Sequence, residues 1–537
     1  MSHPFNEDFR FGSASWAQDT DLRRAGLFGS RGPRIGHWRD NSLRLDGDAP
    51  ILTVGGAGSG KTRDLLGYVL CDSSGLPMLV LDPRAELACI SAHIHAAHGE
   101  HAWHWNPMGL CGLPRNRCNP LDILDRDSPT FHADVKFIVE GLIPLSGEGN
   151  GRYFELRARE WLENLIKSRI ERHGKMTLPD LYRLINVVES DRRAWADHLE
   201  AMLASSSESI RRTAAEMLTK QQDTPKEFGA IMGEIYAHLS FLDDPALLAS
   251  LENPEFSLKA LTDTRRTAKV FLNIPAEYLS IWSPLVRLFF TVTMLYKARA
   301  PEAPRIMLLV DEAGQLGRFE ALLRAFTYGR GFGVRAWAIF QDIGQIVRNF
   351  GAPALQSFMG SAQTRQFFGV RDYETARLVS DMLGTETLEY DDVLQQEAAR
   401  RQKRETVERV MRGDDPFAAA HDYAHFRRNA EHRTKQARPL MTPDEILAMP
   451  EDRQILFISG KDLKPVYANK YPYFTRREMA GHYLPNPYHP PVGSVVVATR
   501  LGKKRIPVVT ERVPGKYASF PQYASGYWSY VKGYRPD

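Results

Sequence analysis

A glycine-rich stretch around residues 55–62 has the residue types and spacing of a phosphate-binding loop. Gly55, Gly60, Lys61 and Thr62 fit the pattern G-x-x-x-x-G-K-[ST]. Such a loop needs glycine because its amides close around phosphate oxygens, and Cβ atoms would stand in the way. The residues predicted to bind the phosphates of a nucleotide are Gly55, Gly58, Ser59, Gly60, Lys61 and Thr62.

The chain on either side of this loop favours a nucleotide site over a chance match in a glycine-rich turn. An apolar, β-branched run precedes the loop at 50–54, and an apolar run compatible with a helix follows at 63–70. The N-terminus of that helix would favour an anion. Lys61 would bridge the β- and γ-phosphates of ATP, and the Thr62 hydroxyl would hold Mg²⁺.

Two adjacent carboxylates predict that the bound triphosphate is hydrolysed. The apolar run Ile306–Val310 predicts a buried strand, and Asp311 and Glu312 follow it directly. Asp311 would hold Mg²⁺ through a water molecule, and Glu312 would orient or deprotonate the water that attacks the γ-phosphate. The alternative is a strand that ends in a solvated acidic turn.

Three further polar residues are candidates for the same site. Gln341 ends another apolar run, where its amide would touch both the γ-phosphate and the attacking water; the alternative is a polar residue at a strand exit. Arg330 would reach the nucleotide of a neighbouring subunit and offset charge on the γ-phosphate. It would otherwise be a surface arginine in a glycine turn, and Arg335 competes with it for the role.

The bulk composition is that of an ordinary soluble globular protein, with 43% hydrophobic and 25% charged residues. A chain of 537 residues is too long for one core, so about two to four domains are expected. The net charge of +4 neither requires nor excludes a nucleic acid partner, because the sum hides local patches. Four scattered cysteines favour a reducing cytoplasm over a disulfide framework.

No segment of the sequence has the character of a signal peptide or of the ~20-residue apolar run that a transmembrane helix needs. The nearest run, Ile281–Tyr296, contains Pro284 and Arg287 and predicts a buried helix instead. A cluster of histidines suggests a metal site, but no cysteine or carboxylate pattern completes it, so solvated histidines are expected. These residues are His93, His95, His98, His101 and His104.

Alternating strand and helix patterns predict an α/β fold with a largely parallel sheet. Residues 1–128 would contain an N-terminal segment and the first part of a P-loop nucleotide-binding domain, and 258–484 its second part. Helical spacing without strand-like runs predicts an all-α insert at 129–257. The charged segment 397–438 is expected to be a solvated helix or a mobile loop, and 485–537 a Pro/Tyr-rich C-terminal tail.

Taken in chain order, the motifs resemble those of the type IV secretion coupling proteins, the TraG/TraD-like ATPases of conjugation, which are related to FtsK-like and HerA-like translocases. The match covers most of residues 11–480. Besides the loop, Arg330 and Gln341, the matching stretches are 12–17, 81–87, 118–122, 311–317 and 438–445. The family usually has Lys-Gly where this chain has Arg84-Ala85.

The resemblance implies a RecA-like P-loop domain interrupted by an all-α domain and assembled as a hexameric ring. ATP and Mg²⁺ would bind between subunits, with Arg330 acting in trans. The implied partners are single-stranded DNA with its relaxase, or protein effectors, and the inner-membrane components of a type IV secretion channel. The implied function is an ATP-hydrolysing coupling protein and DNA translocase. The alternatives are a substrate receptor or adaptor, in which ATP mainly drives assembly, and a free cytosolic DNA translocase.

The chain departs from the family pattern at its start. Family members usually carry two transmembrane helices ahead of the stretch matched by 12–17, and only about ten residues precede that stretch here. The expected location is therefore cytoplasmic and peripheral, at the inner-membrane face. Either the protein docks on a membrane partner, or an anchor is missing from this sequence.

Overall fold

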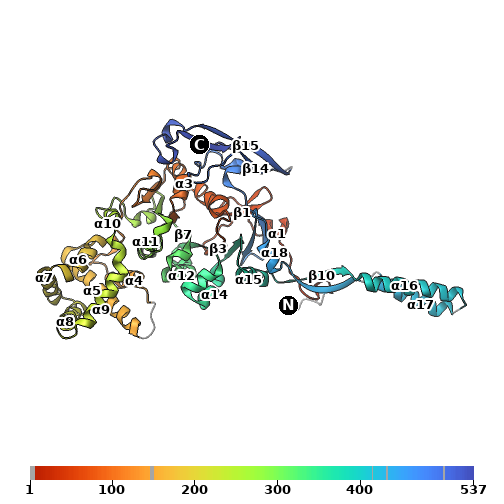
Figure 1. Ribbon diagram of the computed structural model, residues 1–537, viewed down its shortest axis with the longest axis horizontal. Helices are drawn as coiled ribbons and strands as arrows, with labels where there is room; N and C mark the ends of the chain where they lie inside the picture. Colours follow the sequence, from red (N-terminus) through yellow and green to blue (C-terminus); the bar gives the residue numbers. More distant parts are fainter. Residues whose placement is uncertain (1–6, 146–149, 414, 431–432, 500–501) are drawn as a thin grey trace.

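The computed structural model describes residues 7–145, 150–413, 415–430, 433–499 and 502–537. Within them, an eleven-stranded sheet runs through the centre of the molecule, in the order β2-β1-β13-β12-β9-β3-β8-β7-β4-β6-β5 (Figure 1). Its strands are β1 (Arg34–Trp38), β2 (Asn41–Arg44), β3 (Ile51–Gly55), β4 (Met78–Pro83), β5 (His101–Trp105), β6 (Ala268–Ile274), β7 (Ile306–Val310), β8 (Val334–Phe340), β9 (Thr364–Phe368), β12 (Arg453–Ile458) and β13 (Val466–Asn469).

Most of this sheet is parallel. The strands β9, β3, β8, β7, β4, β6 and β5 are parallel to one another. β12 pairs antiparallel with β9, and β13, β1 and β2 extend the sheet further in antiparallel fashion. β3, β6, β7 and β8 are buried along their whole length. Continuous burial is typical of parallel strands with helices on both faces, and the α/β class with a largely parallel sheet is confirmed.

Alternate residues of β7 point into two separate cores, one on each face of the sheet. Met307 and Leu309 pack with α2 (Gly67–Cys71) and α3 (Glu86–Ala97). Leu308 and Val310 pack in the core that contains α11 and α12. The other helices around the sheet are α1 (Asp19–Arg24), α11 (Ser283–Arg299), α12 (Glu320–Thr327), α13 (Ile343–Phe350), α14 (Ala352–Ser361), α15 (Tyr373–Leu383) and α18 (Pro443–Leu447).

The chain between β5 and β6 forms helices and, as far as the structure describes it, no strand. Its helices occupy the left of Figure 1, and buried side chains such as Trp161 form their core. The all-α insert predicted at 129–257 falls in this region, and its boundaries stay a prediction. The helices are α4 (Phe131–Leu142), α5 (Asn150–His173), α6 (Leu178–Ser190), α7 (Arg192–Leu203), α8 (Glu208–Asp223), α9 (Pro225–Leu239) and α10 (Pro245–Leu251).

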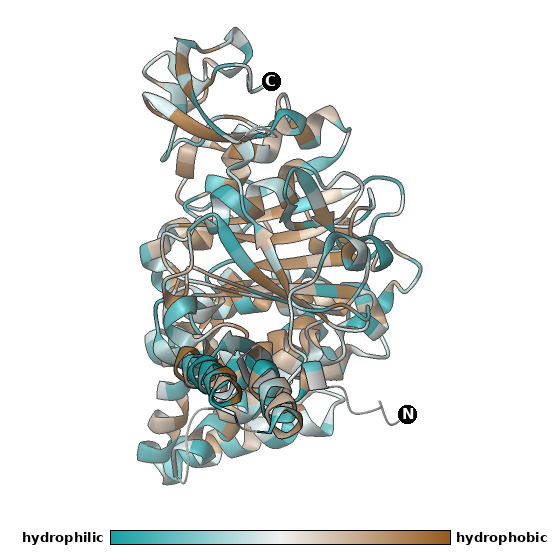
Figure 2. Cartoon of the chain, turned by 90° about the vertical axis from the view of Figure 1, so that its right-hand side faces the viewer, coloured by the Kyte–Doolittle hydropathy of each residue, from teal (hydrophilic) through white to brown (hydrophobic). Residues whose placement is uncertain are grey.

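A two-stranded ribbon and a helical hairpin project from the main sheet. β10 (Thr385–Asp391) pairs antiparallel with β11 (Arg433–Pro439). Beyond the ribbon, α16 (Val393–Met411) packs against α17 (Pro416–Ala430). This arm extends to the right in Figure 1, and Figure 2 looks onto its tip. Much of the charged segment 397–438 is therefore helical and exposed.

The C-terminal residues form a second, antiparallel sheet at the top of Figure 1, made of β14 (Ser494–Thr499), β15 (Gly502–Arg512) and β16 (Tyr527–Val531). The Tyr488 hydroxyl donates to the Arg84 carbonyl oxygen, just ahead of α3, at 2.8 Å. The region described from the sequence as a tail thus packs against the main domain. Its core consists of Leu484, Tyr517, Tyr523, Trp528 and Tyr530.

Two histidines that the sequence predicts to be solvated are buried, which corrects that prediction. His104 stacks on Phe271 with ring centroids 5.3 Å apart, and His95 Nδ1 lies 3.0 Å from Glu100 Oε2. Burial lowers the pKa of both histidines to about 4, so both are neutral at pH 7. Within the described residues, no group of three or more His, Cys, Asp or Glu side chains is arranged to hold a metal ion.

None of the described helices combines the length and the apolar character needed to cross a membrane. The apolar run at 281–296 forms most of α11, which is buried against the sheet. Pro284 lies in its first turn, where the missing amide hydrogen costs no helical hydrogen bond.

Candidate functional site

The candidate residues gather at the carboxyl ends of three neighbouring strands, β3, β8 and β7. The loop 55–62 follows β3, Asp311 and Glu312 follow β7, and Gln341 follows β8. β8 lies between the other two strands and is parallel to both. Because the carboxyl ends of parallel strands share one edge of the sheet, segments far apart in the sequence meet here.

The loop after β3 adopts a conformation that requires glycine at two positions. Gly60 has a φ of +85°, and a Cβ atom there would lie 2.3 Å from a carboxylate oxygen of the following helix. A Cβ atom on Gly56 would lie 2.2 Å from the Gly369 carbonyl oxygen. A helix begins at Lys61, within the last two residues of the loop motif, and continues as α2. This combination has the form of an anion cradle.

Lys61, Glu312 and Gln341 form a chain of polar contacts. Lys61 Nζ lies 2.8 Å from Glu312 Oε1. The side-chain amide of Gln341 donates to the other oxygen, Glu312 Oε2, at 2.8 Å. The structure therefore brings together a cation, a carboxylate and an amide that the sequence placed in three separate motifs.

Asp311 is buried beside this contact chain. Its Oδ1 accepts a hydrogen bond from the Glu312 amide at 3.0 Å. Burial, together with the neighbouring Glu312 carboxylate, raises the pKa of Asp311 to about 7. A divalent cation nearby would favour the charged form and lower this pKa.

The backbone and a buried glutamine hold these side chains in place. Glu312 has a φ of +55°, a left-handed conformation that costs a non-glycine residue about 1–3 kcal/mol. The Gln345 side-chain oxygen accepts a hydrogen bond from the backbone amide of Gln341 at 3.0 Å. A Cβ atom on Gly314 would lie 2.2 Å from that same oxygen and would displace the Gln345 side chain.

The remaining predicted residues lie in the loop or directly after it. Gly55 ends β3, Gly58 and Ser59 form the turn, and Thr62 is the second residue of the helix. The Ser59 hydroxyl is buried and has no hydrogen-bond partner in the part of the chain that the structure describes. A bound phosphate is one group that would satisfy it.

Two cations next to the loop have no counterpart in the sequence-based predictions. Lys470 Nζ donates to the Ser59 carbonyl oxygen at 2.7 Å and lies 3.6 Å from Asp64 Oδ2. Burial lowers the pKa of Lys470 to about 8. The guanidinium of Arg371 lies 4.0 Å from the position that a Cβ atom on Gly58 would take. Arg371 follows β9 and Lys470 follows β13. The order of the strands in the sheet brings both residues next to the loop.

The two candidate arginines lie away from this edge of the sheet. Arg330 precedes β8, its Nε is 2.9 Å from Asp48 Oδ1, and its side chain is 68% exposed. Arg335 is buried within β8 and donates to the carbonyl oxygens of Ala49 and Leu45, at 3.0 and 3.4 Å. Arg335 therefore holds the segment before β3 in place, and Arg330 is the exposed one of the pair.

The chain matches the sequence model of a known family over residues 10–491, and the family is described as Type IV secretory system Conjugative DNA transfer. The matched range contains every candidate residue of the site. It ends before the C-terminal sheet of β14, β15 and β16.

Two curated proteins are similar over most of this chain. The conjugal transfer protein TraG of Rhizobium radiobacter is 25% identical over 452 residues, which cover 82% of this chain and 64% of that protein. The conjugal transfer protein TraG of Escherichia coli is 22% identical over 497 residues, which cover 82% of this chain and 72% of that protein. The chain thus spans 64–72% of the length of these relatives.

Among solved structures, the plasmid coupling protein TrwB in complex with ADP and Mg²⁺ has a similar fold. The TM-score is 0.59, and the alignment covers 85% of this chain and 93% of that one. The sequence identity is 15%, so the likeness concerns the fold. It agrees with the predicted α/β fold with a largely parallel sheet.

Proposed function

Because the chain belongs to the family of type IV secretory system conjugative DNA transfer proteins, we propose that it is an ATP-hydrolysing coupling protein. It would deliver DNA with its bound relaxase, or protein substrates, to a type IV secretion channel. The observation that carries the proposal is the contact chain from Lys61 through Glu312 to Gln341 beside the anion cradle. Nucleotide binding alone requires neither a carboxylate nor an amide at this place.

The site fits the phosphates of ATP together with Mg²⁺. The cradle lacks Cβ atoms where they would collide, and the Thr62 hydroxyl and Asp311 carboxylate are oxygen donors of the kind that Mg²⁺ prefers. We assign Thr62 as a direct ligand and Asp311 as a residue that holds the ion through water. When bound, Mg²⁺ supplies positive charge against the β- and γ-phosphates. The ADP and Mg²⁺ bound to TrwB support this assignment.

The ion pair between Lys61 and Glu312 has a role in the proposed cycle. Binding of ATP would draw Lys61 from the carboxylate to the phosphates. Glu312 would then accept the proton of the attacking water, while Gln341 orients that water. The base therefore becomes available only when the nucleotide is in place.

Arg330 would complete the site of a neighbouring subunit. It precedes β8 whereas Gln341 follows it, and a strand of this length spans about 20 Å. Arg330 therefore lies too far from the loop of its own subunit to contact the γ-phosphate. Its exposure allows contact with a second copy, and repetition of such a head-to-tail contact closes a ring. We propose a hexamer, in agreement with the family resemblance.

The proposed partners are single-stranded DNA, relaxase or effector proteins, and inner-membrane components of the secretion channel. These partners would place the protein at the cytoplasmic face of the inner membrane. DNA contacts would be mainly to the backbone, so binding should weaken steeply with salt. The names of the relatives, which refer to conjugal transfer, support this set of partners.

The rate of ATP hydrolysis with and without single-stranded DNA tests the proposal. We expect turnover that DNA stimulates and that the Lys61→Ala substitution abolishes. Normal turnover in the Lys61→Ala variant would place the activity outside this site. Binding of an ATP analogue without any hydrolysis would favour the adaptor function, in which ATP mainly drives assembly.

A further inference from the structure

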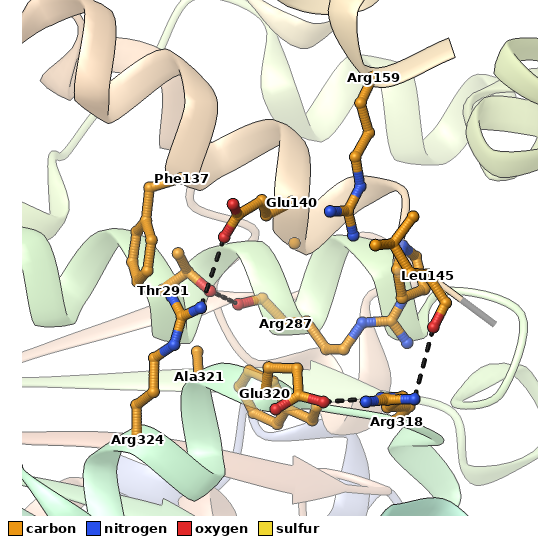
Figure 3. Close-up of a pocket in the computed structure, with 13 residues that line it drawn as sticks. Phe137, Glu140, Leu145, Arg159, Arg287, Thr291, Arg318, Glu320, Ala321 and Arg324 are labelled. Atoms are coloured by element: carbon orange, nitrogen blue, oxygen red, sulfur yellow. Dashed lines mark hydrogen bonds and ion pairs between the residues drawn. The ribbon is translucent and has the colours of Figure 1, made fainter. Parts of the chain in front are cut away.

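A positively charged cavity of about 320 Å³ lies between helices α4, α5 and α11 and residues 318–324, which follow β7 (Figure 3). Four arginines and two glutamates line it, which gives the lining a net charge of +2. These residues are Arg159 of α5, Arg287 of α11, Arg318, Arg324 and Glu320 of the segment around α12, and Glu140 of α4.

Both glutamates already have a cationic partner. Arg318 Nε lies 2.6 Å from Glu320 Oε1. A guanidinium nitrogen of Arg324 lies 3.5 Å from Glu140 Oε2. Within the described residues, neither Arg159 nor Arg287 forms an ion pair, and they account for the excess positive charge of the lining. Glu140, Glu155 and Glu163 act on Arg159 electrostatically.

Arg287 is the less compensated of these two arginines. Arg287 is only 6% exposed. One terminal nitrogen of its guanidinium donates to the Ser283 hydroxyl at 3.1 Å and to the Leu316 carbonyl oxygen at 2.8 Å. Its Nε has no hydrogen-bond partner in the described part of the chain. Burial lowers the pKa of Arg287 to about 10, and also lowers the pKa of Arg159. Arg287 is thus still charged at pH 7, and a buried charge without a counter-ion is costly.

We propose that this cavity binds a phosphate group, either from a DNA backbone or from a free phosphate compound. The planar fork of arginine pairs with oxyanions through two parallel hydrogen bonds. Arg159 and Arg287 reach the cavity from separate helices in Figure 3, so one anion between them would compensate both. The volume is that of a small-molecule site, which begins at about 300 Å³.

Arg287 also connects the cavity to the candidate nucleotide site. Leu316, whose carbonyl oxygen it holds, ends the short helix Ala313–Leu316 that begins next to Glu312. A phosphate that attracts Arg287 would weaken this contact and shift the segment that carries Glu312. This consequence rests on the proposed ATPase function, whereas phosphate binding does not.

Calorimetric titration of the full chain with inorganic phosphate, at constant ionic strength, tests the proposal. The Lys61→Ala variant serves as the background because it removes the lysine of the competing loop. We expect it to bind phosphate, and the added Arg159→Gln substitution to weaken binding at least about tenfold, because a charge-assisted hydrogen bond is lost. Arg172→Gln, at the exposed end of the same helix, is the matched control and should change nothing.

Arg324→Gln is a second variant that should fold, because its side chain is 46% exposed, and it should also weaken binding. Titration with oligothymidylate identifies the source of the phosphate. If the source is DNA, both variants bind the oligonucleotide more weakly and phosphate displaces it; if it is a free compound, only phosphate binding falls. The proposal is overturned if the Lys61→Ala background binds no phosphate, or if neither arginine substitution weakens binding. Absence of ATPase activity in the chain without substitutions, with phosphate binding intact, speaks against the proposed function alone.

Discussion

At the scale of single residues, Glu312 occupies the position on which the proposed chemistry depends most. One carboxylate oxygen contacts Lys61 and the other contacts Gln341, each at 2.8 Å. The left-handed backbone at this residue fixes where the carboxylate lies. If Lys61 moves from Glu312 to the phosphates when ATP binds, Glu312 would be inactive as a base until then.

We expect Glu312→Gln to slow ATP hydrolysis at least about 100-fold, because glutamine cannot accept the proton of the attacking water. ATP binding should be unchanged or tighter, since Lys61 is no longer held by a charge. Steady-state turnover and titration with a fluorescent ATP analogue measure the two effects. Glu374→Gln, at the exposed start of α15, is the control. A wild-type rate in Glu312→Gln would exclude this residue as the base.

The pKa of Asp311 predicts how its substitution changes stability with pH. Its folded pKa of about 7 is higher than the ~4 of an unfolded chain. The buried carboxyl thus contributes full stability below about pH 4, and this contribution is lost as the pH rises to about 7. We expect Asp311→Asn to raise the melting temperature by a few degrees above pH 7 in metal-free buffer, and less at lower pH. Thermal unfolding followed by circular dichroism measures the melting temperatures. Melting temperatures of the wild type and the variant that change equally with pH would contradict the prediction.

The sequence predicted the site residues that belong to local motifs and missed those that do not. Lys61, Asp311 and Glu312 can be predicted because their neighbours along the chain form recognisable motifs. Lys470 and Arg371 follow strands whose place beside the loop depends on the order of the whole sheet. No local pattern encodes that order, so their position next to the loop appears only in three dimensions.

At the scale of elements, apolar runs along the sequence predicted the parallel strands almost to the residue, with the exception of β9. The run Ile306–Val310 is strand β7, because a strand buried on both faces must be apolar throughout. β1, β9 and β13 were missed, since polar residues such as His37, Arg365 and Asn469 interrupt their pattern. The C-terminal region was described as a tail because its core is built from aromatic side chains scattered over irregular chain.

We expect Trp528→Ala to unfold the C-terminal sheet. Trp528 is 3% exposed and packs with Tyr517 and Tyr523, so its removal should cost about 3–5 kcal/mol in that sheet. Limited proteolysis with mass spectrometry should then show cleavage in the C-terminal region while the main domain stays intact. Tyr527→Ala, at an exposed neighbouring position, should resist cleavage like the wild type. Equal resistance of both variants would mean that this sheet does not depend on its aromatic core.

At the scale of the whole molecule, positive charge is concentrated at the C-terminus. Residues 492–537 contain eight Lys or Arg and two Asp or Glu, a net +6, whereas the entire chain has a net +4. Residues 1–491 therefore carry a net charge of −2. A DNA backbone bound by this protein would meet its strongest attraction at the C-terminal sheet.

We expect the double substitution Lys504→Gln and Arg505→Gln, at exposed positions of β15, to weaken single-stranded DNA binding. Each lost phosphate contact should lower the salt dependence of the affinity by about one unit of slope. Fluorescence anisotropy over a range of salt concentrations measures both. The pair Arg192→Gln and Arg193→Gln, at the exposed start of α7, is the matched control. An unchanged slope would place the DNA elsewhere.

The arrangement of the site also bears on assembly, because under the proposed role of Arg330 one subunit would hold only part of the site. The loop 55–62, Glu312 and Gln341 lie at the carboxyl ends of the strands, and Arg330 lies at the amino end of β8. A head-to-tail ring would join these two ends at every interface.

ATP hydrolysis by mixed subunits, in the presence of single-stranded DNA, tests this central claim most directly. The variants Lys61→Ala and Arg330→Ala should each be inactive alone. A 1:1 mixture should recover up to about a quarter of the wild-type rate, because that share of interfaces pairs an intact loop with an intact Arg330. A mixture of Lys61→Ala with Glu312→Gln should recover nothing, since both damage the same side of the interface. Recovery in the first mixture alone is the predicted result, and its absence would contradict a site built from two subunits.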